Sequence, residues 1–237
     1  MALKGKKVLA LIPARGGSKG IEKKNIFPIA DKFLIDYTID AASNSSYVDE
    51  VFISSDSQEI LNYAKNMKLK ILHRPKEFAT DNSSAIDVVN HFYKELITKG
   101  YDDTQEDFYL TYLQPTSPLR TSKILDESFE LLAESKETSL ISLTKNKYSP
   151  YKSFTLDKKQ RAESLFEESK TNECRQNLQT TYRANGAIYT FLISQFLSNK
   201  GFPSNKSRAF IMSNQNSLDI DTMEDIDLLK SILTENK

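Results

Sequence analysis

Short apolar runs alternate with amphipathic segments along the first 145 residues, and this alternation is the strongest constraint on the fold. Runs of strand length stand at 8–12, 50–54, 69–72, 108–113 and 139–143. Segments with apolar residues at helical spacing separate them, at 34–45, 57–65, 83–98 and 121–134. Strands that alternate with helices form βαβ units, so the sequence predicts a doubly wound α/β core with a mostly parallel sheet.

The alternation breaks at 145–182, a polar segment with scattered aromatic residues. The period of two in 152–156 predicts a hairpin there, so we interpret the whole segment as an inserted arm. Either it is a surface excursion, or it forms a dimer contact and delivers residues to a site. Strands at 187–191 and 208–212 and a helix at 222–234 then complete a single domain spanning 1–237.

The first strand runs into a glycine-rich, cationic loop, IPARGGSKGIEKKN at 12–25. Gly16 and Gly17 bring backbone N–H groups close to an anion, while Arg15, Lys19 and Lys24 neutralise its charge, so the loop is suited to phosphate. It matches neither the Walker A nor the G-x-G-x-x-G pattern, and a basic surface turn is the alternative. Its position after the first strand favours a ligand, because ligands of open α/β sheets bind there.

Two more loops follow predicted strands on the same side of the sheet. The loop at 74–84 contains Arg74, which is either a ligand contact or a surface cation, and Asp81 and Ser83, which are candidate helix N-caps. The loop at 113–121 holds a polar pair between two prolines, so it is stiff. Gln114 offers both a donor and an acceptor at its start, which suits ligand recognition, although a plain turn is the alternative.

Two carboxylates lie near the C-terminus, at Asp219 and Asp221. Residues two apart in an extended segment face the same way, so both carboxylates point to one side. Such a pair beside phosphates is typical of a magnesium site, although Asp221 is also a candidate N-cap. The segment 182–189 adds an arginine and Asn185, with Arg175 upstream, which suit a carboxylate or phosphate. Together these features point to phosphoryl or nucleotidyl transfer.

Composition excludes several other classes. The 32 basic and 32 acidic residues cancel, which argues against nucleic-acid and membrane partners. A single cysteine, Cys174, excludes an internal disulfide and argues against structural zinc. No apolar run approaches the roughly 20 residues needed to span a bilayer, and the N-terminal run is too short for a signal peptide, so we expect a cytoplasmic protein.

The motifs resemble those of bacterial CMP-sialic acid synthetases, the N-acylneuraminate cytidylyltransferases. The similar segments are, in chain order, IPARGGSKGIEKKN (12–25), ISSD (53–56), HRPKEFATD (73–81), LQPTSPLRT (113–121), RANGAIY (183–189) and IMSNQNSLDIDT (211–222). The resemblance implies a Rossmann-like, GT-A-like nucleotidyltransferase fold. It also implies transfer of CMP from CTP to a nine-carbon α-keto acid sugar, with release of pyrophosphate.

The resemblance also implies roles for individual residues. The catalytic set would be Arg15, Lys24, Asp219 and Asp221. Mg²⁺, or alternatively Mn²⁺, would be bound by Asp219 and Asp221. The nucleotide would be bound by Ala14, Arg15, Gly16, Gly17, Ser18, Lys19, Lys24, Asn25, Arg74, Asp81 and Ser83. The sugar would be bound by Gln114, Lys152, Arg175, Asn185, Tyr189 and Phe202.

Departures from the family pattern leave the sugar open. Asp31 stands in a turn where the family has glycine, and Pro203 follows Phe202 where a second aromatic is expected. N-acetylneuraminate is the first expectation, and legionaminate, pseudaminate or another Kdo-like acid is the alternative. The arm at 145–182 implies a homodimer in which Lys152 or Arg175 reaches the partner's site. A catalytically silent nucleotide-binding regulator is the alternative from a different class.

Overall fold

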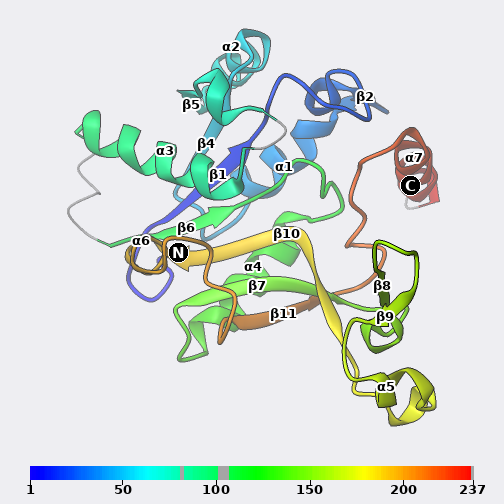
Figure 1. Cartoon of the computed structure of the whole chain (residues 1–237). Coiled ribbons are helices and arrows are strands. Elements are labelled where there is room, and N and C mark those ends of the chain that lie inside the picture. The colour runs from blue at the N-terminus through cyan, green and yellow to red at the C-terminus, as the bar shows by residue number, and fades with distance from the viewer. Residues whose placement is uncertain (81–82, 101–106, 236–237) are drawn as a thin grey trace.

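The computed structural model describes residues 1–80, 83–100 and 107–235, and its main feature is a seven-stranded sheet (Figure 1). The strand order is β11-β7-β10-β6-β1-β4-β5. The strands are β1 (Val8–Pro13), β4 (Glu50–Ser55), β5 (Lys70–His73), β6 (Tyr109–Tyr112), β7 (Ser139–Lys145), β10 (Tyr182–Leu192) and β11 (Arg208–Met212). Only β10 runs antiparallel to its neighbours, so the predicted mostly parallel mixed sheet is confirmed.

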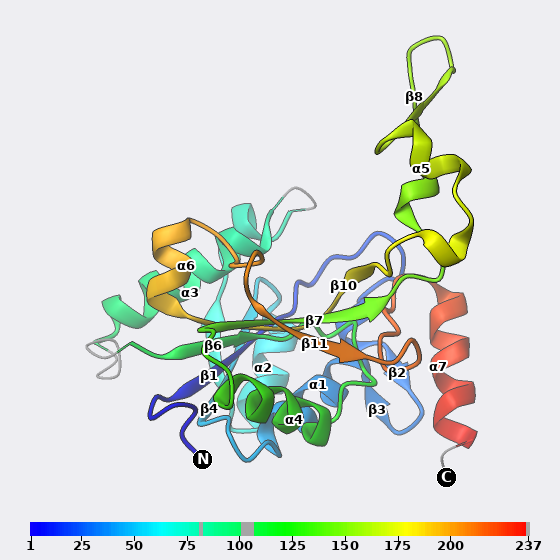
Figure 2. The same ribbon diagram turned by 90° about the horizontal axis from the view of Figure 1, so that it is seen from below.

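Helices cover both faces of this sheet, as the alternation predicts (Figure 2). The helices α1 (Leu34–Ser43), α2 (Gln58–Asn66) and α4 (Ser122–Ala133) contribute to the apolar core on one face. The helices α3 (Ala85–Thr98) and α6 (Ile193–Asn199), of which α6 was not predicted, contribute to the core on the other. None of the described helices has the length and apolar character to cross a membrane.

A third apolar cluster joins the two ends of the chain. Ile21 and Leu34 pack with Ile220 and Ile226, the last of which lies on α7 (Met223–Glu235). Burial of these side chains removes apolar surface from water and so stabilises the contact. The cluster brings the glycine-rich loop beside the carboxylate segment, which are far apart in sequence.

The predicted caps of α3 need correction. The N-cap is Ser84: its hydroxyl accepts from the backbone N–H of Asp87, and the Asp87 carboxylate accepts from the N–H of Ser84. This reciprocal capping box is a strong helix start, so the prediction of Ser83 as N-cap is wrong. The other candidate, Asp81, lies outside the described residues.

The turn between the short strands β2 (Pro28–Ile29) and β3 (Lys32–Phe33) also differs from expectation. Its left-handed residue is Ala30, with φ 55°, and not Asp31. The departure from glycine at Asp31 therefore falls on a residue whose backbone is not left-handed, and the conformational cost of such a backbone lies on an alanine instead.

The segment between β7 and β10 projects from the sheet as an arm (Figure 2). It contains an antiparallel hairpin of β8 (Phe154–Leu156) and β9 (Ala162–Ser164), followed by α5 (Glu168–Asn172). The hairpin expected from the period of two is thus confirmed. Its large exposed apolar side chains are Tyr148, Phe154, Leu156, Leu165 and Phe166.

Candidate active site

A cavity of about 340 Å³ opens beyond the carboxyl ends of β1, β5 and β6. This is the end of the sheet at which ligands of open α/β folds bind. Many predicted site residues line it, namely Arg15, Gly17, Ser18, Lys24, Asn25, Arg74, Ser83, Gln114, Asp219 and Asp221. The fold therefore gathers the cationic loop, Arg74, the stiff loop and the carboxylates at one place.

Other predicted site residues do not line this cavity, namely Ala14, Gly16, Lys19, Lys152, Arg175, Asn185, Tyr189 and Phe202. For two of them the physical reason is packing. Ala14 is fully buried, and its N–H donates to the carbonyl of Ser54 at 2.9 Å. The N–H of Gly16 donates to Asp56 at 2.9 Å, and a Cβ at Gly16 would stand 2.8 Å from the Cβ of Ser57. These residues seat the loop against the turn after β4.

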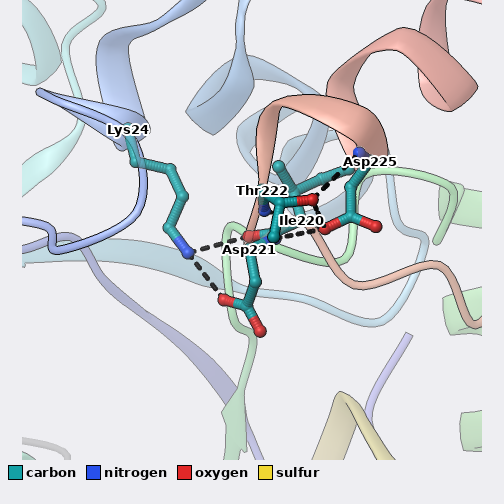
Figure 3. Close-up of polar contacts among 5 residues, drawn as sticks. All are labelled: Lys24, Ile220, Asp221, Thr222 and Asp225. Carbon is teal, nitrogen blue, oxygen red and sulfur yellow. Dashed lines mark hydrogen bonds and ion pairs between the residues drawn. The ribbon is translucent and has the colours of Figure 1, made fainter.

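Lys24 connects the cationic loop to the carboxylate segment (Figure 3). It begins the short 3-10 helix η1 (Lys24–Ile26), and its side chain is only 14% exposed. The ammonium donates to the carbonyl of Ile220 at 2.7 Å and to the carboxylate of Asp221 at 2.9 Å. Its charge is therefore held at the wall of the cavity, where a phosphate could take the place of the carboxylate.

The second carboxylate, Asp219, lies on the same side of its segment. Asp219 and Asp221 both line the cavity, whereas Ile220 between them is fully buried, which is the alternation predicted from the sequence. Loss of hydration in the cavity wall raises the pKa of Asp219, a hydrogen bond with Thr116 opposes this rise, and the charge of Asp221 adds to it. A nearby cation would relieve the repulsion between the two carboxylates.

The alternative interpretation of Asp221 as a helix N-cap is wrong. α7 begins at Met223, and Thr222 caps it: the Thr222 hydroxyl accepts from the N–H of Asp225 at 3.4 Å. The Asp225 carboxylate in turn accepts from the N–H groups of Thr222 and Asp221 (Figure 3). The Asp221 side chain is not used in capping and faces Lys24.

Gly20 is a site residue that the sequence reasoning missed. A Cβ at this position would clash with the backbone carbonyl of Asp221. Only glycine therefore lets the loop approach the carboxylate segment so closely. Its place in the same loop as Gly16 and Gly17 was the only signal that could have found it.

Arg74 is the residue with the clearest need for a ligand. It follows β5 and is only 4% exposed, yet its Nε and Nη2 atoms have no hydrogen-bond partner in the described part of the chain. Burial lowers the pKa of its guanidinium, and the nearby Tyr112 and Asp56 oppose that shift. Buried donors without partners are costly, so an acceptor in the cavity would stabilise them.

Two more residues of the nucleotide set are held in place by the loops that carry them. Asn25 is 7% exposed, and its side-chain amide donates to the carbonyl of Arg15 at 2.8 Å. The Ser83 hydroxyl donates to the carbonyl of Glu77 at 3.0 Å and accepts from the N–H of Thr80. Both face the cavity with part of their hydrogen-bonding capacity already used.

Asn185, predicted to bind the sugar, has its side chain committed to the protein. Its Oδ1 accepts from the hydroxyl of Ser142 at 2.6 Å, and its Nδ2 donates to the hydroxyl of Ser217 at 2.9 Å. The residue is 4% exposed and does not line the cavity. In this structure Asn185 supports the backbone around it, and of the predicted sugar set only Gln114 lines the cavity.

Tyr189 and Phe202, the two aromatic residues of the predicted sugar set, do not line the cavity, but they belong to a cluster with Tyr112, which was not predicted as a site residue. The ring of Phe202 packs at 5.3 Å from Tyr112 and 5.4 Å from Tyr189. Tyr112, the last residue of β6, lines the cavity. Its position one residue before the stiff loop was the signal available in the sequence.

The predicted arm residues stay away from this cavity within one chain. Lys152 ends the turn η4 (Pro150–Lys152), and its ammonium donates to the carbonyl of Thr171 at 2.9 Å. Arg175 begins the turn η5 (Arg175–Asn177), which follows α5 as the arm returns to β10. Neither residue lines the cavity of its own chain.

The residues present fit a hard divalent cation that arrives with phosphate. The described residues contain no group of three or more His, Cys, Asp and Glu side chains able to hold a metal. Asp219 and Asp221 are two oxygen donors only, and Mg²⁺ is often bound by one or two carboxylates plus substrate phosphates. The donor set is therefore complete only with a phosphorylated ligand.

Comparison with known protein families shows which family this chain belongs to. The sequence model of a family described as cytidylyltransferase matches residues 9–236. The chain belongs to the cytidylyltransferase family. It is 33% identical over 221 residues to an N-acylneuraminate cytidylyltransferase of Streptococcus agalactiae, covering 92% of this chain and 51% of that protein. The corresponding protein of Escherichia coli is 34% identical over 238 residues, covering 95% of this chain and 52% of the relative.

The chain thus spans about half the length of these curated relatives. It matches a pseudaminic acid cytidylyltransferase of Campylobacter jejuni over nearly the whole of both proteins, with 30% identity over 233 residues and 97% coverage of each. A solved CMP:2-keto-3-deoxy-manno-octonic acid synthetase complexed with CTP superposes with a TM-score of 0.67 at 15% identity, covering 98% of this chain and 100% of that one. This last likeness confirms the nucleotidyltransferase fold.

Proposed function

We propose that the chain transfers CMP from CTP to the anomeric hydroxyl of a nonulosonic acid and releases pyrophosphate. The observation that carries this proposal is the shared cavity. Arg15 and Lys24 line it from the cationic loop, Nε and Nη2 of Arg74 lack a partner among the described residues, and Asp219 and Asp221 complete the wall. A triphosphate, a base with acceptor atoms and a divalent cation would together satisfy these groups.

The acid that we favour is N-acetylneuraminate, an N-acylneuraminate, because the relatives with 33% and 34% identity are named N-acylneuraminate cytidylyltransferases. Pseudaminate is supported by a relative that matches over nearly its whole length, and legionaminate or another Kdo-like acid is the other alternative. The difference lies in the substituents of the sugar. Tyr112 lines the cavity and packs through Phe202 against Tyr189, so we expect this aromatic cluster to influence which substituents are accepted.

The chemistry follows from positioning and charge. Attack of the anomeric hydroxyl on the α-phosphorus, in line with the leaving pyrophosphate, develops negative charge on phosphate oxygens. Lys24 and Arg15 would stabilise this charge from the cationic loop. Lys24 must then exchange its Asp221 partner at 2.9 Å for a phosphate oxygen, which leaves the Asp221 carboxylate available to a cation.

Mg²⁺ would be held by Asp219 and Asp221, with Mn²⁺ as the alternative ion. When bound, it supplies charge neutralisation at the phosphates and favours the ionised form of the attacking hydroxyl. Neither histidine lines the cavity. This is in keeping with a reaction that needs no imidazole base.

A homodimer through the arm is also part of the proposal. The exposed apolar side chains of the arm would be covered by a second chain, and the arm would carry Lys152 and Arg175 toward the partner's cavity. Light scattering tests this directly. A monomer with full activity would exclude it.

The deciding experiment measures pyrophosphate release from CTP and Mg²⁺ with a panel of nonulosonic acids. We expect release only when an accepted acid is present, with N-acetylneuraminate the best. Release with pseudaminate alone would select the alternative substrate. CTP binding without release for any acid would support the catalytically silent regulator.

A further inference from the structure

Arg120 is a buried cation that the proposed chemistry does not use. It lies in the stiff loop, its side chain is fully buried, and it does not line the cavity. No carboxylate among the described residues pairs with it, and burial alone lowers the pKa of its guanidinium to about 9. A buried charge without a counterion is expensive, so its hydrogen bonds must carry the reason for its presence.

Those hydrogen bonds join three separate elements. One guanidinium nitrogen, Nη1, donates to the carbonyl of Ala187 at 2.8 Å and to the carbonyl of Gln114 at 3.3 Å. The other, Nη2, donates to the hydroxyl of Thr38 on α1 at 2.7 Å. The Thr38 hydroxyl in turn reaches the Gln114 carbonyl at 3.4 Å.

The carbonyl of Ala187 needs such a donor because β10 is irregular there. The pairing of β10 with β7 shifts register between Ala184 and Tyr189, and the pairing with β6 begins only at Tyr189. Residues 185–188 therefore bulge out of both ladders, and bulged backbone groups need other partners. Ser142 and Asn185 supply some of them, and Arg120 supplies the donor for Ala187.

The bulge in turn determines where the Gln114 side chain lies. Gly186 has φ 77°, and a Cβ there would stand 2.7 Å from Oε1 of Gln114. The side-chain amide of Gln114 thus lies against the bulge, while Arg120 donates a hydrogen bond to the backbone carbonyl of Gln114. Gln114 is the residue of the predicted sugar set that lines the cavity.

We propose that Arg120 is a positioning residue for the acid-sugar side of the site. Its planar fork sets the distance between the Gln114 loop and the 185–188 bulge, and thereby aims the Gln114 amide at the sugar. This inference rests on the proposed function. Lysine has a single ammonium in place of the fork, so it cannot reproduce the arrangement in which Nη1 is bonded to the two carbonyls while Nη2 is bonded to the Thr38 hydroxyl.

The test compares Arg120→Lys and Thr38→Val with the wild type, using steady-state kinetics for both substrates. A misplaced contact can cost as much as about 100-fold, so we expect the sugar KM to rise about tenfold or more in Arg120→Lys. The rise should be a few-fold in Thr38→Val, which keeps the side-chain volume. The KM for CTP, and CTP affinity measured by calorimetry, should change less than about twofold.

Thr190→Val is the matched control. Its hydroxyl is also buried on β10, at 3.0 Å from that of Thr111, but Thr190 is in regular pairing with β6 and β7, outside the bulge. We expect this variant to lower the melting temperature without a change in either KM. A similar response in Arg120→Lys, or an equal rise in both KM values, would overturn the positioning role. A wild type that releases no pyrophosphate with any acid would instead overturn the proposed function, and this inference with it.

Discussion

The regions around Arg74 and Arg120 each contain a buried arginine, but the two guanidinium groups differ in how many of their nitrogens are hydrogen-bonded to the protein. Both arginines are almost completely buried, at 4% and 0% exposure, and burial lowers the pKa of both guanidinium groups. At Arg74, which lines the cavity, Nε and Nη2 lack partners among the described residues. At Arg120 only Nε does, because the other two nitrogens are hydrogen-bonded to protein oxygens.

This difference in hydrogen bonding distinguishes a residue suited to bind a ligand from a residue that stabilises the fold. A buried donor without a protein partner lowers the stability of the free protein and gains energy when a ligand supplies an acceptor. A buried donor with protein partners contributes its energy to the geometry of the fold. On the proposed function, the same type of side chain would bind a ligand at Arg74 and position other residues at Arg120, and their hydrogen bonds distinguish the two.

The largest effect should come from the carboxylates on the ligand-facing side. Asp219→Asn and Asp221→Asn each remove a charged oxygen donor, so kcat should fall on the order of 100-fold or more. Because both side chains are exposed, the melting temperature should hardly change. Asp227→Asn, an exposed aspartate on α7, is the control and should keep full activity. Near-normal turnover in both site variants would refute the metal assignment.

Replacing each of the two arginines by methionine tests this comparison directly. Arg74→Met should raise the KM for CTP by roughly 10- to 100-fold, the equivalent of losing a hydrogen bond to a charged group. It removes an uncompensated buried charge without orphaning a protein acceptor, so its free energy of unfolding should stay the same or increase.

Arg120→Met should behave in the opposite way in denaturant titrations. It leaves the carbonyls of Ala187 and Gln114 without this donor, so the free energy of unfolding should fall by about 1–3 kcal/mol. The comparison fails if both methionine variants shift stability in the same direction.

Gly186→Ala tests whether the bulge near Arg120 holds the Gln114 side chain in place. A left-handed backbone costs an alanine roughly 1–2 kcal/mol, and here the added Cβ also displaces the Gln114 amide. Gly100→Ala shares the positive φ, at 61°, but its Cβ would meet no atom of the described residues within 4 Å. We expect both variants to lose stability in thermal melts, and only Gly186→Ala to raise the sugar KM. Equal kinetics in the two would show that Gln114 is not held by the bulge.

The smallest effect on the site should come from the arm. Phe154→Ser and Leu156→Ser remove side chains that are 53% and 64% exposed, so stability of the single chain should change by less than about 0.5 kcal/mol. If the arm forms the dimer, its dissociation constant in analytical ultracentrifugation should rise about tenfold or more. Leu228→Ser, an equally exposed leucine on α7, is the control and should leave association unchanged.

Much of the fold could be predicted because its signals are local. Strand lengths, helical spacing and caps such as Ser57 and Thr121 depend on a few neighbouring residues. The antiparallel β10 and the helix α6 were harder to predict. The start of β10 is polar and exposed because it carries the base of the arm, so the apolar run began only at 187.

The site was predicted only where residue type and loop position were sufficient. Arg15, Lys24, Arg74 and the carboxylate pair were found because charge after a strand end is visible in the sequence. Arg120 and Gly20 were not, since their roles depend on which distant backbone atoms they meet. Asn185 was assigned to the sugar because an exposed and a committed amide look the same in a sequence.

The sequence by itself determined the α/β architecture and the family of the chain, since each depends on local pattern or on motif identity. Only the tertiary structure decided which polar groups remain unsatisfied. Arg74 and Arg120 both follow strand ends in loops of similar chemistry. Oxygens of Ala187 in the bulge, Gln114 and Thr38 accept from Nη1 and Nη2 of Arg120. In contrast, no protein oxygen among the described residues reaches Nε and Nη2 of Arg74. Whether a buried hydrogen-bond donor finds an acceptor depends on how distant segments pack together, so it cannot be deduced from the order of residues.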